Sequence, residues 1–132
     1  MKAKAEIDAG VCGFKTIAVA TCDDEQHVRI DIYSGCEKVR AMAASLKDNG
    51  AVDAYQEIGP AGRSVVLSAA KEALKGCCAA CAAPVGVFKA MQVAAGLALP
   101  KDISIGLSKV ADESGADASR ACSGGVPEAG RQ

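Results

Sequence analysis

Three stretches near the start of the chain have the patterns of β-strands, and two of them alternate apolar and polar side chains with the period of two that a half-buried strand requires. In the first stretch, Ala3, Ala5 and Ile7 alternate with charged residues. The second, residues 14–21, is rich in β-branched side chains, and the third, residues 27–33, alternates again. Because a short polar turn separates the last two, they form an antiparallel hairpin. The pattern predicts an antiparallel sheet of three strands.

Helical spacing replaces this alternation after Gly35. Apolar side chains then recur three or four residues apart, at Cys36, Val39, Ala43 and Leu46, up to a glycine at position 50 that is typical of a helix end. Pro84 suits the start of a later helix that is apolar on nearly every side. The helices predicted here span residues 36–50, 64–74 and 84–97, with a short helical or irregular segment over residues 52–58.

The chain changes character again after Pro100. Ile103, Ile105 and Leu107 alternate with other residues, which allows a fourth strand near residues 102–107. From Ser108 onward the sequence is mostly Ser, Ala, Gly and charge, with too little apolar material to form a core. We therefore predict an α+β fold, an antiparallel sheet packed against several helices, in one domain over residues 1–107. A flexible C-terminal tail is predicted over residues 108–132.

Composition excludes several classes of function. Fifteen basic and sixteen acidic residues give a net charge of -1, and only 3% of residues are aromatic, so neither a polyanion partner nor nucleic acid is expected. The apolar run at residues 76–88 is too short to cross a bilayer, and residues 1–10 do not resemble a signal peptide. We expect a cytoplasmic protein with no membrane partner. Cytoplasmic thiols are usually reduced, so seven cysteines favour metal or redox chemistry over disulfides.

The predicted hairpin sorts the cysteines into two groups. Cys12 precedes its first strand and Cys36 follows its second, so antiparallel pairing brings both to the same open end. Cys22 and His27 flank the turn at the other end, roughly 25 Å away at about 3.3 Å per residue. We therefore expect Cys12 and Cys36 to be neighbours, whereas His27 is expected to be a solvated hairpin residue and Cys22 to be structural.

A cluster of three further cysteines lies in the sequence Gly-Cys-Cys-Ala-Ala-Cys, before the last predicted helix. Cys78 and Cys81 have the C-x-x-C spacing that lets two sulfurs face one ion or cluster. If this segment packs at the open end of the hairpin, four thiolates converge there, from Cys12, Cys36, Cys78 and Cys81. Cys77 is then a substitute ligand or a mobile thiol. The alternative is that these small apolar side chains only fill an alanine-rich core.

These stretches resemble a known family, the U-type iron–sulfur cluster assembly scaffolds (the NifU N-terminal or IscU-like domain). The resemblance covers residues 5–95 and rests on Val11-Cys12-Gly13, on Ser34-Gly35-Cys36 at a helix start, and on Cys77-Cys78 before an alanine-rich helix. It implies that Cys12, Cys36 and Cys78 hold a nascent cluster or a zinc ion, with Cys77 in the place of the family's histidine.

Two departures from the family alter what the resemblance implies. Phe14 replaces an aspartate thought to keep the cluster labile, and Cys81 adds a thiol, so the site is richer in sulfur. The family's Leu-Pro-Pro-Val-Lys segment, which binds a chaperone, has no equivalent before Cys77. Four thiolates suit a [2Fe–2S] or [4Fe–4S] cluster, or zinc, held firmly.

The function predicted from the sequence is therefore binding of an iron–sulfur cluster, or of zinc, in cluster assembly, storage or delivery, without enzymatic turnover. A cysteine desulfurase and cluster-accepting proteins are the expected partners, and a homodimer could share a cluster. One alternative is a thiol–disulfide redox protein that uses Cys78 and Cys81. Another is a structural zinc-binding interaction module. A third is an interaction module with no site of its own, which would present Val87, Met91 and Leu97 to a partner, and against it stands the interpretation of this apolar helix as a central core helix.

Overall fold

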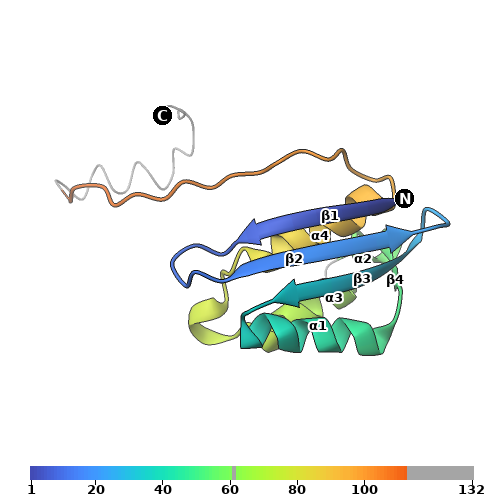
Figure 1. Cartoon of the computed structure of the whole chain (residues 1–132), viewed down its shortest axis with the longest axis horizontal. Coiled ribbons are helices and arrows are strands. Elements are labelled where there is room, and N and C mark those ends of the chain that lie inside the picture. Colours follow the sequence, from blue (N-terminus) through green and yellow to red (C-terminus); the bar gives the residue numbers. More distant parts are fainter. Residues whose placement is uncertain (61, 113–132) are drawn as a thin grey trace. The chain divides into compact units, whose positions relative to one another are not determined.

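A four-stranded antiparallel sheet with helices on one side forms the folded part of the chain (Figure 1). The computed structural model describes residues 1–60 and 62–112. The strands follow the order β1-β2-β3-β4, so consecutive strands are neighbours. This confirms the α+β fold with an antiparallel sheet. The strands are β1 (Lys2–Asp8), β2 (Lys15–Cys22), β3 (His27–Ser34) and β4 (Val52–Asp53). The helices are α1 (Glu37–Asn49), α2 (Ala54–Glu57), α3 (Val65–Ala73), a 3₁₀ turn η1 (Gly76–Cys78) and α4 (Ala83–Ala94).

The register of the sheet separates an inner face from an outer face. Lys4 pairs with Val19, which in turn pairs with Asp31, and these side chains lie on the outer face. On the inner face, Ala18 of β2 and Val28 of β3 are fully buried. The alternation that predicted the strands therefore also predicted which side of the sheet the helices cover.

Helix α4 lies against the inner face of β1 and β2 (Figure 1). Its buried side chains are mostly small or flexible, and they include Val87, Ala90 and Met91. The closest approach is at Gly86, where an added Cβ would lie 2.4 Å from Cγ1 of Ile7 on β1. Because Ile7 sits near the end of β1, this contact brings the start of α4 to the end of the sheet where β1 stops.

Two carboxylates accept hydrogen bonds at the N-terminal ends of the shorter helices. The Asp53 carboxylate caps α2 by accepting hydrogen bonds from the backbone of Tyr55 (3.0 Å) and Gln56 (3.3 Å). The buried Glu57 carboxylate accepts from Ser64 Oγ (2.6 Å) and from the N–H groups of Val65 and Val66 at the start of α3. Negative charge at a helix N-terminus is stabilising, so Glu57 ties α2 to α3.

The strand predicted near residues 102–107 was wrong. The fourth strand of the sheet is β4, which pairs with β3 through Val28 and Val52. The first compact unit of the chain ends at Lys101, and residues 102–112 have no regular secondary structure. Alternation shows only that a segment suits an extended backbone, whereas a strand also needs a hydrogen-bonding partner. In this segment Ile105 is 72% exposed and Leu107 is 92% exposed. The predicted tail from residue 113 onward, with Cys122, lies outside the described residues.

Within the described residues, none of the helices is long and apolar enough to cross a membrane.

The contact between Gly86 and Ile7 gives a testable prediction. Alanine is a better helix former than glycine by about 1 kcal/mol, but overpacking costs about 1–3 kcal/mol. We expect Gly86→Ala to lower the free energy of unfolding by about 1 kcal/mol, measured by urea denaturation. In an Ile7→Ala background, which removes the opposing side chain, the same change should raise it. Equal effects in both backgrounds would contradict the close packing.

Candidate functional site

Cys12 lies in a tight turn between β1 and β2. The Gly13 N–H donates to the Gly10 carbonyl at 2.9 Å, and the Gly10 N–H donates to an Asp8 carboxylate oxygen at 2.9 Å. Gly10 and Gly13 have φ values of 93° and 78°, which favour glycine and explain why the turn is built from these residues. Cys12 is exposed, so its thiol is accessible to solvent and to a ligand.

Cys36 is the N-cap residue of α1, as the helical spacing predicted. Its backbone N–H donates to Ser34 Oγ at 3.1 Å, and its carbonyl accepts from the Arg40 N–H at 2.9 Å. The thiol does not cap the helix, and the side chain is half-buried against the core. It therefore lies at the N-terminal end of α1, at the positive end of the helix dipole.

Cys78 is the last residue of η1, and Cys81 lies in the turn between η1 and α4. The Cys81 N–H donates to the Cys78 carbonyl at 3.1 Å, which folds the C-x-x-C sequence back on itself. The Ala83 N–H donates to Cys81 Sγ at 3.4 Å. This N–H is in the first turn of α4, where backbone donors have no partner within the helix. Both side chains are partly buried against the core.

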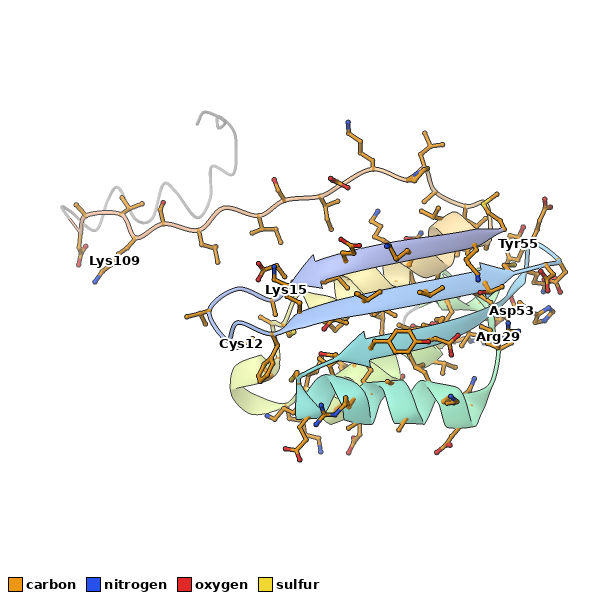
Figure 2. The ribbon with its side chains drawn as sticks, viewed as in Figure 1. Cys12, Lys15, Arg29, Asp53, Tyr55 and Lys109 are labelled. Carbon is orange, nitrogen blue, oxygen red and sulfur yellow. The ribbon has the colours of Figure 1, made fainter. Side chains whose placement is uncertain are left out.

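Three contacts hold these segments at one end of the sheet. A Cβ on Gly35 would lie 3.2 Å from the Phe14 ring, so the β1–β2 turn packs on the start of α1. Lys38 Nζ donates to the Lys75 carbonyl at 3.2 Å, which joins α1 to the start of the cysteine-rich turn. The contact of Gly86 with Ile7 fixes the start of α4 beside the end of β1. Figure 2 shows Cys12 at this end, far from Arg29 and Asp53.

The structure thus brings the predicted cysteines to one end of the sheet without joining them in a formed site. Cys12, Cys36, Cys78 and Cys81 all lie at this end, while Cys22 lies at the opposite end, as the hairpin argument predicted. Among the described residues, no group of three or more His, Cys, Asp or Glu side chains is placed to hold a metal ion. The side chain of Cys77 lies outside the described part of the structure, so its role as a ligand stays a prediction.

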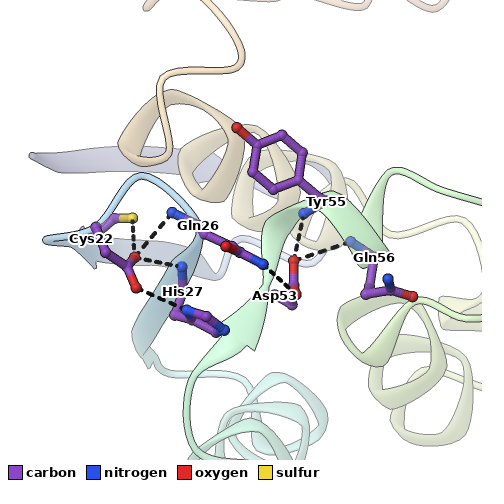
Figure 3. Close-up of polar contacts among 7 residues, drawn as sticks. Cys22, Gln26, His27, Asp53, Tyr55 and Gln56 are labelled. Atoms are coloured by element: carbon purple, nitrogen blue, oxygen red, sulfur yellow. Dashed lines mark hydrogen bonds and ion pairs between the residues drawn. The ribbon is translucent and has the colours of Figure 1, made fainter.

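Sequence reasoning missed a polar network at the other end of the sheet (Figure 3). One oxygen of Asp24 accepts from the N–H groups of Gln26 (3.0 Å) and His27 (2.8 Å), and the Cys22 thiol lies 3.7 Å from it. Its other oxygen lies 2.8 Å from His27 Nδ1. Gln26 Nε2 donates to Asp53 at 2.8 Å and joins the turn to β4. The sequence did contain a signal for this network, because an aspartate at the start of a polar turn, here Asp24, often accepts hydrogen bonds from the backbone of the turn.

The pair of Asp24 and His27 has a clear electrostatic consequence. The hydrogen bond to Asp24 raises the pKa of His27 above its ordinary value of 6.5. The bonds from the His27 side chain and from the backbone hold the pKa of Asp24 well below its usual range. Both residues are exposed, and Asp24 already accepts several hydrogen bonds. We therefore interpret the network as one that stabilises the hairpin turn rather than as a catalytic site.

The fold and this arrangement of thiols define a small α+β protein with a cysteine-rich end. The profile of a family described as "Family of unknown function (DUF6951)" matches residues 3–107. Because this is most of the chain, the protein belongs to that family. No curated protein and no solved structure matches the chain.

The titration of His27 tests the hairpin network. The chain has one histidine, so its imidazole C–H signals in an NMR titration are unambiguous. We expect Asp24→Asn to lower the titration midpoint of His27, because the partner that stabilises the imidazolium is removed. The matched control is Asp23→Asn, which changes an exposed neighbouring acid. Equal midpoints in the two variants would contradict the pairing.

The same pair gives the sign of a pH effect on stability. Because the pKa of His27 is raised on folding, its contribution to stability is present below pH 6.5, as long as Asp24 stays ionised, and it is lost as the pH rises through the folded value. Thermal unfolding of the wild-type chain, compared with Asp24→Asn, should show a difference in melting temperature that shrinks from about pH 6 to about pH 8.

Proposed function

We propose that the cysteine-rich end of this protein binds an iron–sulfur cluster, which the protein stores or passes on. The observation that supports this most is that three separate chain segments carry thiols to one end of the sheet. These segments are the β1–β2 turn with Cys12, the start of α1 with Cys36, and the turn before α4 with Cys78 and Cys81. Junctions between elements are the usual location of binding residues.

The donor chemistry at this end fits a soft metal centre. Sulfur ligands favour iron–sulfur clusters and zinc over hard cations. Backbone N–H groups that donate to cysteine sulfur, as the Ala83 N–H does to Cys81, tune the potential of bound clusters.

Ligand binding would require the thiols to come closer than the described structure holds them. Cys12 lies on an exposed turn flanked by two glycines, so this ligand can move at low cost. Cys36 and Cys81 are each held at the start of a helix, and they are the more rigid donors. In this arrangement the starts of α1 and α4 hold the thiols of Cys36 and Cys81 in place, and the β1–β2 turn moves to bring Cys12 to the ligand. A bound cluster would supply iron and sulfide as cargo for an acceptor protein.

Metal analysis of protein purified without oxygen tests the proposal. We expect iron and acid-labile sulfide in near-equal amounts, together with visible charge-transfer absorption. Cys36→Ala and Cys81→Ala should each remove most of the bound iron and the absorption. Cys22→Ala is the matched control, since Cys22 is buried at the far end of the sheet and should leave both unchanged. Circular dichroism of each variant separates loss of ligand from loss of fold.

The alternatives predict different results in the same experiment. Zinc without sulfide would favour a structural zinc-binding module, and no metal in any preparation would overturn the proposal. In that case Cys78 and Cys81 should be titrated against oxidised and reduced glutathione. A dithiol function predicts that Cys12→Ser leaves their redox equilibrium unchanged, whereas cluster binding predicts that Cys12→Ser weakens iron retention.

A further inference from the structure

Strand β1 is an edge strand with an unusually regular exposed side. Among the described residues, no strand pairs with it on the side away from β2. Seven residues keep a continuous register with β2, and β1 contains neither proline nor a bulge. Edge strands are usually blunted by such features, by charged side chains, especially lysine, or by charges that point inward. In β1 the charged side chains all belong to the outer face, and Lys2 and Lys4 are balanced by Glu6 and Asp8, so the charges do not repel a second copy of the same strand.

The backbone hydrogen bonds show which residues face this free edge. The Cys22 N–H donates to the Met1 carbonyl at 2.9 Å, and the Ala9 N–H donates to the Phe14 carbonyl at 3.2 Å. In an antiparallel ladder, alternate residues direct their backbone groups to the same neighbour. The odd-numbered residues of β1 therefore bond to β2, and the N–H and carbonyl groups of Lys2, Lys4, Glu6 and Asp8 point to the free edge.

We infer that β1 pairs with β1 of a second copy of this chain, antiparallel and centred on Ala5, to form a dimer with one continuous sheet. Because only even-numbered residues present free backbone groups, a two-fold pairing must place even-numbered residues opposite one another. In the register centred on Ala5, Lys4 faces Glu6 of the partner subunit, and Lys2 faces Asp8 of the partner subunit. The outer face of β1 is thus complementary in charge to itself.

The neighbouring registers are less complementary, because each keeps only two facing pairs of opposite charge and places two like charges opposite each other at its centre. Pairing centred on Lys4 would place Lys4 directly opposite Lys4 of the partner subunit. Pairing centred on Glu6 would place two glutamates opposite each other. Like charges directly opposite across antiparallel strands are destabilising, so charge selects the register centred on Ala5. The ion pair between Lys4 and Glu6 within one strand, at 2.9 Å, shows that these side chains already lie along the same face.

The inner face of β1 also fits this partner. Ala3, Ala5 and Ile7 pack against the core but remain partly exposed, since β1 has a neighbour on one side only. In the dimer, Ala5 faces Ala5 of the partner subunit, and Ile7 faces Ala3 of the partner subunit. The half-exposed apolar side chains of two edges then cover one another, while the charged row stays in water.

Sedimentation equilibrium of the full chain tests this dimer, over about 10 to 500 µM because an interface of this size belongs to the weak class. We expect wild-type protein to dimerise. Lys4→Glu and Glu6→Lys should each weaken the dimer by about tenfold, because each places like charges opposite at two symmetric positions. An equimolar mixture of the two variants should recover the wild-type dimer, since every facing pair is again of opposite charge.

The control for surface charge is Lys71→Glu, on the exposed side of α3, which should leave the dimer unchanged. A monomer over the whole range, or failure of the mixture to recover, would overturn the inference. Amide hydrogen exchange at Lys4 and Glu6 gives a second check. Protection that disappears on dilution supports pairing between copies, while protection that is independent of concentration means that another part of the same chain covers the edge, which would also overturn it.

Discussion

The close packing of α4 on the sheet is the constraint on which the rest of the structure depends. The chain has few aromatic residues, so its core is filled by small side chains that let backbones approach closely. At the tightest point Gly86 leaves room for Ile7, and a larger residue would push the start of α4 away from β1. The turn before α4 carries Cys78 and Cys81. The close packing at Gly86 is therefore one of the contacts that set the position of these thiols at the end of the sheet.

The two ends of the sheet are built in different ways, and this difference bears on their roles. At the hairpin end, Asp24 accepts several hydrogen bonds and Gln26 joins the turn to β4, so the polar groups satisfy one another. At the cysteine end, the Cys36 thiol makes no capping bond and Cys12 is exposed. Polar groups that already bond to one another stabilise a fold, whereas groups left available can take a ligand.

Side-chain periodicity predicted most of the fold, and it failed where tertiary pairing decides. It located three strands, and the hairpin geometry correctly separated Cys12 and Cys36 from Cys22 and His27. Strand β4 was not predicted, because a strand of two residues is too short to show an alternating pattern. Ile103 and Ile105 alternate as a strand does, yet a strand exists only where a neighbour accepts its hydrogen bonds. The pairing of Asp24 with His27 depends on turn geometry that residue types alone do not specify.

Pairing through β1 would constrain how the cysteines act. An antiparallel arrangement directs the two copies of β1 oppositely, so the Cys12 turn of one chain lies toward the start of β1 in the other. The two cysteine-rich ends are then separated by about the length of the strand, roughly 20 Å for seven residues. A cluster could not be shared across this interface. If both proposals hold, each chain would supply all of its own ligands, and Cys81 would be the fourth thiol of a site that is complete within one subunit.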